Sequence, residues 1–354
     1  INETNIVNLD VPITKNPTKK ATRIFKMLKR VGQAKKDNGI QVTISHLYIY
    51  NFLNVMSRRR DKSICVMHGP ASLYFNKPSY YFGRWFYKKS DAIVCMSKYF
   101  KHQTIKELGV PEQRVHCIYN PIDLEKINRL KLEAISDEKE KSIFENRVFI
   151  YVGRFQEQKA QWHAIRAFSK VHAKHKDTHL VFLGDGDEKI LNYLETLVND
   201  YGLNNNVHFF GRKSNPFKYV ANAFCTFYTA RWDGLPMVLL ESLACNTPAI
   251  SSDSNSGPRE ILDPSSDFLK RTQELEIVEY GILCKTCDGN RYNVNEPLTE
   301  AENQFADAAS ILIEQKDVYT RFQENASDRA KRFSIDSITN AYEQLSRALV
   351  ANEN

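Results

Sequence analysis

Two positively charged side chains stand in a short polar segment between an apolar run and a helical pattern. Arg154 and Lys159 belong to the segment Gly153–Lys159, which follows the apolar run 147–152 and precedes a helical pattern that begins at Ala160. A helix N-terminus offers backbone N–H groups and the positive end of a dipole, and nearby cations add charge. The segment therefore predicts a binding place for an anion such as a phosphate.

Two carboxylates flank the start of a second, short helix. Asp233 lies just before the helix expected over Pro236–Cys245, and Glu241 follows eight residues later, inside that helix. A carboxylate among apolar side chains is costly unless it accepts hydrogen bonds, and paired sugar hydroxyls are good donors. The carboxylates can accept hydrogen bonds from sugar hydroxyls, and the N–H groups at the helix start can bind phosphate. Together they predict a nucleotide-sugar pocket. The alternative at this point is that Asp233 only caps the helix and Glu241 pairs with a buried arginine.

Alternating strands and helices must position these segments. Apolar strands are expected over 147–152, 179–183, 207–210, 223–229, 248–251 and 281–284, and earlier in the chain over 42–44, 63–67, 92–96 and 115–118. Helical patterns separate most of them, which predicts βαβ units with parallel sheets covered on both faces. In such sheets ligands bind beyond the carboxyl ends of the strands, where the polar segments stand.

The predicted fold class is therefore α/β, with two doubly wound, Rossmann-like domains. We expect an N-terminal, acceptor-side domain over 1–145, whose charged, helix-prone end 124–145 connects it to the second domain. The C-terminal, nucleotide-sugar-binding domain is expected over 146–334, and residues 335–354 are expected to dock back on the first domain.

Composition limits the class of protein. A chain of 354 residues with 42% hydrophobic and 26% charged residues is typical of a globular protein of two domains. It has no run of 18 apolar residues for a membrane span, and its seven cysteines without framework spacing favour a reduced, cytoplasmic protein. Because the chain starts with Ile and shows no leader, we expect that it begins inside a longer product or has been trimmed.

Positive charge is concentrated in the first third of the chain. Residues 1–124 hold 21 basic and 8 acidic residues, whereas the remainder is net acidic. A basic amphipathic helix is expected over Lys19–Lys36, and a second basic segment rich in aromatic residues spans Tyr80–Lys89. Both suit an anionic membrane surface. The alternatives are a solvated helix face or contact with nucleic acid phosphates for the first segment, and buried core for the second.

Several segments together resemble glycosyltransferase family 4. They are Asp233–Glu241 with its continuation to Gly257–Glu260, Tyr151–Arg154 with Lys159, Leu183–Gly186, Val207–Arg212 and Tyr119–Asp123. The resemblance covers nearly the whole chain. It implies a retaining enzyme of the GT-B fold, in which two Rossmann-like domains face each other across a cleft that holds the site.

The resemblance also implies roles for individual residues. Arg154 and Lys159 would stabilise the donor diphosphate, Glu241 would hold the ribose hydroxyls, and Asp233 would hold the sugar hydroxyls. His68, at the end of an N-terminal-domain strand, would face the sugar from across the cleft. The other expected donor contacts are Gly153, Gly211, Arg212, Lys213, Gly234, Leu235, Pro236 and Met237.

The expected reaction is transfer of a hexose or N-acetylhexosamine from a nucleoside-diphosphate sugar to a glycan or lipid-linked glycan. By resemblance the base is uracil, with guanine as the alternative, and the place is the inner face of the cytoplasmic membrane. We expect no cofactor and no metal: Asp185 and Asp187 fit a strand-to-helix turn, and the pair Cys284 and Cys287 lacks the second pair of a zinc site.

The chain departs from the family pattern in three places. Asp233 stands where the family usually has Glu, and Ala160 stands where the family has Gly after the lysine. The first strand and Gly-rich loop of the family are not found, so we expect an incomplete N-terminal sheet that a separate chain or segment supplies. The alternative functions are a nucleotide-sugar epimerase or a phosphorylase on the same fold, or a non-catalytic basic module that binds a membrane surface.

Overall fold

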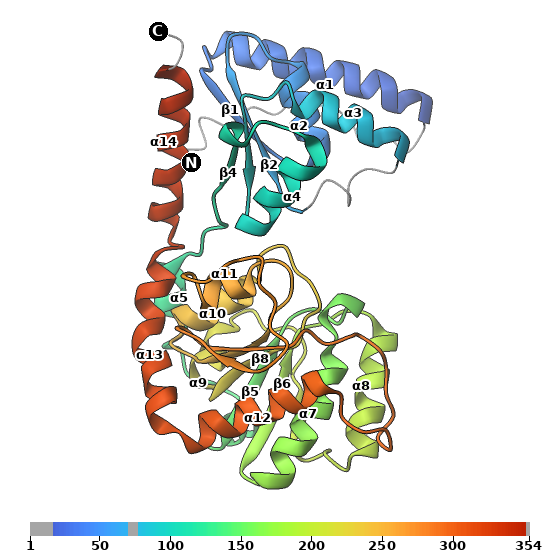
Figure 1. The fold of residues 1–354 in the computed structure, drawn as a ribbon, viewed down its shortest axis with the longest axis vertical. Helices are drawn as coiled ribbons and strands as arrows, with labels where there is room; N and C mark the ends of the chain where they lie inside the picture. Colours follow the sequence, from blue (N-terminus) through green and yellow to red (C-terminus); the bar gives the residue numbers. More distant parts are fainter. Residues whose placement is uncertain (1–16, 70–76, 352–354) are drawn as a thin grey trace. The chain divides into compact units, whose positions relative to one another are not determined.

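The computed structural model describes residues 17–69 and 77–351, and their contacts divide the chain into two compact units. Unit 1 consists of Ile1–Tyr119 with Thr339–Asn354, and unit 2 is Asn120–Ile338. In each unit, helices cover a β-sheet (Figure 1). The expected absence of a first strand and Gly-rich loop stays a prediction, because residues 1–16 lie outside the described residues.

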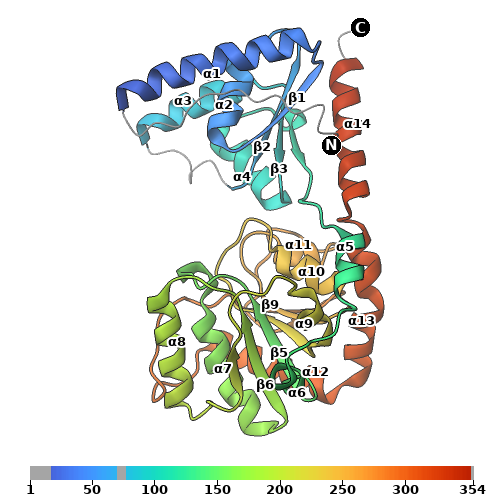
Figure 2. The ribbon, with the colours of Figure 1, turned by 180° about the vertical axis from the view of Figure 1, so that it is seen from behind.

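Unit 1 is built on a four-stranded parallel sheet in the order β1-β2-β3-β4. The strands are β1 (Val42–His46), β2 (Lys62–Met67), β3 (Ala92–Cys95) and β4 (Val115–Cys117). The helices are α1 (Pro17–Asp37), α2 (Tyr48–Met56), α3 (Lys77–Tyr87) and α4 (Lys98–Leu108), with a short 3₁₀ turn at Glu112–Arg114 and the last helix α14 (Ile335–Ala351). Figures 1 and 2 show α1 to α4 on one side of the sheet and α14 on the other. Because both faces are covered, β3 is buried along its whole length, as expected for a parallel strand.

Unit 2 is built on a seven-stranded sheet in the order β10-β11-β9-β8-β5-β6-β7, parallel except for the pair β10 and β11. The strands are β5 (Arg147–Val152), β6 (Thr178–Leu183), β7 (Val207–Phe209), β8 (Cys225–Tyr228), β9 (Ala249–Ser252), β10 (Glu276–Ile277) and β11 (Ile282–Cys284). The helices are α5 (Leu124–Leu130), α6 (Glu138–Ile143), α7 (Gln161–Lys174), α8 (Glu188–Asp200), α9 (Phe217–Asn222), α10 (Met237–Ala244), α11 (Pro258–Leu262), α12 (Glu300–Glu314) and α13 (Lys316–Lys331), with a 3₁₀ turn at Glu157–Lys159. The carboxyl ends of β5, β6, β8 and β9 therefore share one edge of the sheet.

The boundary between the units differs from the one expected from the sequence. The sequence predicts a first domain that ends at residue 145, whereas the contacts assign Asn120 and all that follows, up to Ile338, to unit 2. The cause is local packing, because α5 lies against α10 and the Lys131 ammonium donates a hydrogen bond of 2.9 Å to the Ala244 carbonyl. The charged connection is thus part of unit 2, and the end of α14 from Thr339 on belongs to unit 1.

The strands expected from the sequence are all present, with small shifts at their ends. Strand β10 was not expected, because two residues carry no strand pattern. The short helix expected to include Pro236 begins one residue later, since Pro236 has a ψ of 90° and precedes the first helical turn. Asn246 adopts the left-handed conformation, with a φ of 58°, and ends this helix as a C-cap asparagine does.

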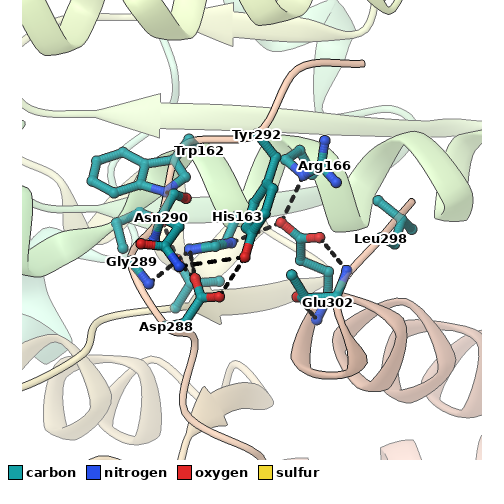
Figure 3. A network of polar contacts seen from close by, with 12 residues as sticks. Trp162, His163, Arg166, Asp288, Gly289, Asn290, Tyr292, Leu298 and Glu302 are labelled. Carbon is teal, nitrogen blue, oxygen red and sulfur yellow. Dashed lines mark hydrogen bonds and ion pairs between the residues drawn. The ribbon is translucent and has the colours of Figure 1, made fainter. Parts of the chain in front are cut away.

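A buried charged network ties the long segment between β11 and α12 to α7 (Figure 3). His163 and Arg166 of α7 both contact the Glu302 carboxylate, at 2.7 and 2.8 Å, and none of the three side chains is exposed. Arg166 also donates hydrogen bonds to the carbonyls of Asn293, at 2.6 Å, and Pro297, at 2.8 Å. Burial opposes ionisation of Glu302, but hydrogen bonds from His163 and Arg166 outweigh it and lower the pKa of this carboxyl.

Replacing Glu302 by Ala is expected to destabilise the protein by about 3–5 kcal/mol, because it leaves Arg166 buried without its counter-charge. Urea unfolding followed by circular dichroism measures the loss, with the exposed residue Glu324→Ala as control, for which about 0.5 kcal/mol or less is expected. Because the folded-state pKa of Glu302 is lowered, its stabilisation is full above the ordinary value of 4.5 and is lost as the pH falls through the folded pKa. A loss at neutral pH no larger than that of the control would contradict the network's role.

Candidate active site

Two loops meet at the sheet edge of unit 2 because β5 and β8 are neighbours in the sheet. The backbone N–H of Arg231 donates to the carbonyl of Gln158 at 2.9 Å, and the Thr229 hydroxyl donates to the carbonyl of Ala160 at 3.0 Å. The Tyr151 hydroxyl, at the end of β5, donates to the Lys159 carbonyl at 2.6 Å. The loop after β5, which carries Lys159, is therefore held firmly against the loop after β8, which carries Asp233.

An ion pair joins the two loops. The Lys159 ammonium lies 2.6 Å from Oδ2 of Asp233, and the Tyr228 hydroxyl donates to the same oxygen at 2.5 Å. The ammonium also donates to the Tyr228 oxygen at 3.1 Å. The structure thus brings together two residues that the sequence places 74 positions apart and predicts for one site.

The other predicted cation on this loop is Arg154. Its side chain is exposed, and it forms no ion pair with any of the described residues. Its loop approaches the loop after β6 so closely that only glycine fits there. A Cβ atom at Gly184 would lie 2.0 Å from the Gly153 carbonyl oxygen, and one at Gly186 would lie 2.5 Å from backbone atoms of Phe155. The two glycines of this family motif are therefore required in this chain by the close approach of the two loops. Ala160 takes the left-handed conformation, with a φ of 48°, at the position where the family has Gly.

Helix α10 presents the second predicted carboxylate. Glu241 is partly buried, burial raises its pKa, and no hydrogen bond or ion pair to its carboxylate is found among the described residues. The alternative that it pairs with a buried arginine is thus not what the structure has. The start of α10 is positioned by the loop after β9, whose Ser256 hydroxyl donates to the Gly234 carbonyl at 2.6 Å. Gly257 lies so close that its Cβ would be 2.3 Å from Pro236, which places Leu235, Pro236 and Met237 firmly at this edge.

The segment expected to line the base follows β7. Gly211 accepts a hydrogen bond from the Gly184 N–H at 2.9 Å, so this segment adjoins the loop after β6. Arg212 is exposed. The Lys213 ammonium points elsewhere, because it pairs with Glu140 of α6 at 2.5 Å and lies near the rings of Phe210 and Tyr219.

His68 belongs to unit 1 and follows the end of β2. Its Nε2 lies 3.1 Å from Nδ1 of His46, the last residue of β1, so one ring donates and the other accepts. Burial lowers the pKa of both histidines, and the charge of His46 lowers that of His68 further. The lowered pKa values favour the neutral form of both rings, and the contact between Nδ1 of His46 and Nε2 of His68 holds the two rings against each other.

Sequence reasoning missed the residues that hold the predicted ones in place. Tyr228 and His46 are each the last residue of a strand, which is the available signal, since strand ends share the polar sheet edge. Tyr151 lies within the apolar run of β5, where nothing in the sequence indicates that its hydroxyl secures the next loop.

Other sequence signals have structural roles. Asp187 caps α8 by accepting from the Lys189 N–H at 2.8 Å, as expected for a strand-to-helix turn. Cys284 and Cys287 are buried thiols whose pKa is raised by burial. Within residues 17–69 and 77–351 no group of three or more His, Cys, Asp or Glu side chains is arranged to hold a metal ion. None of the helices described there is long and apolar enough to cross a membrane.

The histidine pair makes a testable prediction. Both imidazoles are expected to titrate below the ordinary value of 6.5, and His46→Ala is expected to move the pKa of His68 up toward that value, because one of its two causes is removed. Nuclear magnetic resonance of histidine-labelled protein measures this directly, with His116→Ala in β4 as the control that leaves His68 unchanged. A His68 pKa at or above 6.5 in the unaltered chain would contradict the arrangement.

Known proteins resemble this chain in sequence and in fold. A model of glycosyltransferase family 4 matches residues 3–126, and a model of the group 1 glycosyl transferases matches residues 134–274. A glycosyltransferase of Methanocaldococcus jannaschii, itself uncharacterised, is 30% identical over 342 residues, which are 93% of this chain and 84% of that protein.

A second relative is the N-acetylgalactosamine-N,N'-diacetylbacillosaminyl-diphospho-undecaprenol 4-alpha-N-acetylgalactosaminyltransferase of Campylobacter jejuni, 26% identical over 70% of this chain and 57% of that protein. The crystal structure of Anabaena HepE in complex with UDP matches with a TM-score of 0.76 at 16% identity, over 95% of this chain and 85% of that chain. This likeness shows the fold, which is GT-B with two Rossmann-like domains. The chain therefore belongs to glycosyltransferase family 4 and is a glycosyltransferase.

Proposed function

We propose that this glycosyltransferase moves a hexose or N-acetylhexosamine, with retention of configuration, from a nucleoside-diphosphate sugar to a glycan or lipid-linked acceptor. One observation carries the proposal. At a single sheet edge of unit 2, the Lys159 ammonium is held in place near the start of a helix. The carboxylate of Glu241 on this helix has no hydrogen-bond partner among the described residues. A diphosphate and a pair of ribose hydroxyls are the ligand groups that match these two features.

In this proposal the loop after β5 stabilises the leaving diphosphate. Lys159 and Arg154 supply two positive charges, and the start of α10 adds the positive end of its dipole. Charge that develops on the leaving group is best stabilised by groups already in position, and the contacts of Lys159 keep it in position before the donor arrives. These side chains do what a bound metal does in other enzymes, so we propose that transfer needs none.

Glu241 accepts from the ribose hydroxyls in this proposal, and the cost of its burial is offset when they bind. The backbone of Gly211 and Arg212 lines the base. For His68, whose ring is held by His46, we propose contact with the transferred sugar. The solved structure of HepE with UDP supports uracil as the base, and the name of the Campylobacter relative supports a lipid-linked acceptor.

We also propose that unit 1 contacts an anionic membrane surface. On α1, Phe25 is 71% exposed and is followed by the exposed Lys26 and Lys29. On α3, Tyr81 is 75% exposed, and the exposed Trp85 ring lies 3.9 Å from the Lys89 ammonium. Aromatic rings beside cations are suited to the boundary between lipid headgroups and acyl chains.

The sequence left two interpretations open for the aromatic segment of α3, contact with a membrane surface or burial in the core, and different residues of the segment support each. Phe86 and Tyr87 are buried in the core of unit 1, whereas Tyr81, Phe82 and Trp85 are exposed. The exposed members support the membrane proposal, and the buried ones explain why the helix is so rich in aromatic residues.

The function is tested by nucleotide binding and turnover. We expect UDP or GDP to raise the melting temperature, since a ligand that binds only the folded state stabilises it. Lys159→Ala and Arg154→Ala are each expected to lower turnover by about 10²-fold or more, the loss typical of a charge-stabilising group already in position. The control is Lys176→Ala, an exposed lysine at the other end of β6, for which turnover stays within about twofold of that of the unaltered protein.

Two outcomes would contradict this function. One is turnover of the Lys159 and Arg154 variants equal to that of the Lys176 control. The other is that no nucleotide or nucleotide-sugar changes the melting temperature.

The proposal that no metal is needed is tested with a chelator. Turnover in excess EDTA is expected to equal turnover without EDTA.

Membrane contact is tested with vesicles. Replacing both Lys26 and Lys29 by Gln is expected to weaken binding to vesicles rich in phosphatidylserine by about 30-fold at low salt, because each lysine near an anionic surface contributes about 1 kcal/mol. The matched control replaces two exposed lysines of unit 2, Lys139 and Lys316, in the same way. Equal binding by both double variants, or binding that ignores salt, would count against the surface contact.

A further inference from the structure

We propose that Asp233 is the counter-ion of Lys159, held on it by Tyr228, and that the donor diphosphate displaces Asp233 from the lysine when it binds. This inference rests on the proposed function and differs from the role that the family resemblance implies, in which Asp233 holds the sugar hydroxyls. It makes Tyr228 a positioning residue of the donor site.

The hydrogen-bonding capacity of Asp233 is nearly used up by the protein itself. Oδ2 accepts from the Lys159 ammonium at 2.6 Å and from the Tyr228 hydroxyl at 2.5 Å. Oδ1 accepts from the backbone N–H of Gly234 at 2.8 Å. A carboxylate has about four acceptor positions, so about one remains while Asp233 is paired with Lys159.

Glu241 shows the contrast. It stands eight residues further on, and no hydrogen bond to its carboxylate is found within the described residues. The two carboxylates of the motif are therefore in different states before a ligand binds: the first is engaged by the protein, and the second is open. Only the second is ready to accept from ligand hydroxyls.

The surroundings explain why Lys159 needs a counter-ion. Its side chain is 14% exposed and that of Asp233 is 23% exposed, so little water screens either charge. An unpaired ammonium in such a place is destabilised, and a carboxylate at 2.6 Å compensates its charge and holds it in place. A diphosphate offers the same ammonium more negative charge than one carboxylate does, so the two compete for it.

Tyr228 sets the position of this competitor. Its side chain is buried, packed beside the Tyr151 ring, and its hydroxyl touches both charged partners. Burial, and after it the charge of Asp233, raises the pKa of the Tyr228 hydroxyl well above its ordinary value, so it remains a donor to the carboxylate. The hydroxyl of Tyr228 thus holds the carboxylate of Asp233 at the place where it pairs with Lys159.

Competition for Lys159 has a consequence that a sugar-binding role does not have. If Asp233 competes with the diphosphate, removing its charge strengthens binding of a nucleotide that carries no sugar. If Asp233 binds the sugar, the same change leaves the free nucleotide unaffected and weakens only the nucleotide-sugar. A simple loss of structure would weaken both.

The experiment is calorimetric titration of the full chain with UDP, with GDP as second probe, and then with the corresponding UDP- or GDP-glucose. Asp233→Asn is expected to bind the free nucleotide about 5- to 10-fold more tightly than the unaltered protein. The matched control is Asp185→Asn, which removes the same charge from an exposed carboxylate at the same sheet edge and is expected to change affinity less than twofold.

Tyr228→Phe keeps the packed ring and removes only the hydroxyl. It is expected to tighten nucleotide binding by about 2- to 3-fold, and to have no further effect beyond about twofold when added to Asp233→Asn, because it acts through that carboxylate. Melting curves confirm that each variant is folded, and the two independent variants keep the test decisive if one of them is not.

The outcomes separate the possible failures. Unchanged nucleotide affinity in Asp233→Asn with weaker nucleotide-sugar binding would overturn the inference and return Asp233 to the sugar. Tighter binding by Asp185→Asn of the same size would also overturn it, since the effect would then be general charge repulsion. If neither UDP nor GDP, free or sugar-linked, binds the unaltered protein, the proposed function fails and this inference falls with it.

Discussion

The proposed donor site depends on one ion pair, between Lys159 and Asp233, which joins the loops after two neighbouring strands. Strands β5 and β8 are adjacent in the sheet, so their carboxyl ends bring together side chains that are far apart in the sequence. The loops also hold each other through backbone contacts, and glycines at 184, 186 and 257 let further loops approach closely. Contacts of the protein itself therefore hold these loops together and place Lys159, as expected for a protein that stabilises charge through groups already in position.

The sequence was sufficient for the architecture. Strands in parallel sheets are buried on both faces, so they appear as short apolar runs, and each of the expected runs became a strand. The contacts divide the units before Asn120 and not at residue 145, because residues 120–145 look like a linker by composition while their position depends on packing against α10, which no local pattern encodes. Strand β10 was missed because two residues carry no periodicity.

The sequence indicated candidate residues for the site, but not the contacts that these residues make. Motif spacing indicated Lys159, Asp233 and Glu241, but it did not indicate that Asp233 already spends its acceptors on the protein while Glu241 remains open. Such distinctions depend on which side chains meet across the sheet, and Tyr228 and His46 enter the account only there. The sequence showed that Asp233 stands where the family usually has Glu. It did not show that the Tyr228 hydroxyl donates to this carboxylate.

The central claim is that the crevice beside Lys159 and the start of α10 binds the diphosphate of a nucleotide-linked sugar. A crystal structure of the chain with UDP or GDP tests it most directly. The account predicts phosphate oxygens within about 3.2 Å of the Lys159 ammonium, Asp233 moved off that ammonium, and ribose hydroxyls on Glu241. A nucleotide bound elsewhere on the protein, or a diphosphate that leaves the contact between Lys159 and Asp233 intact, would contradict it.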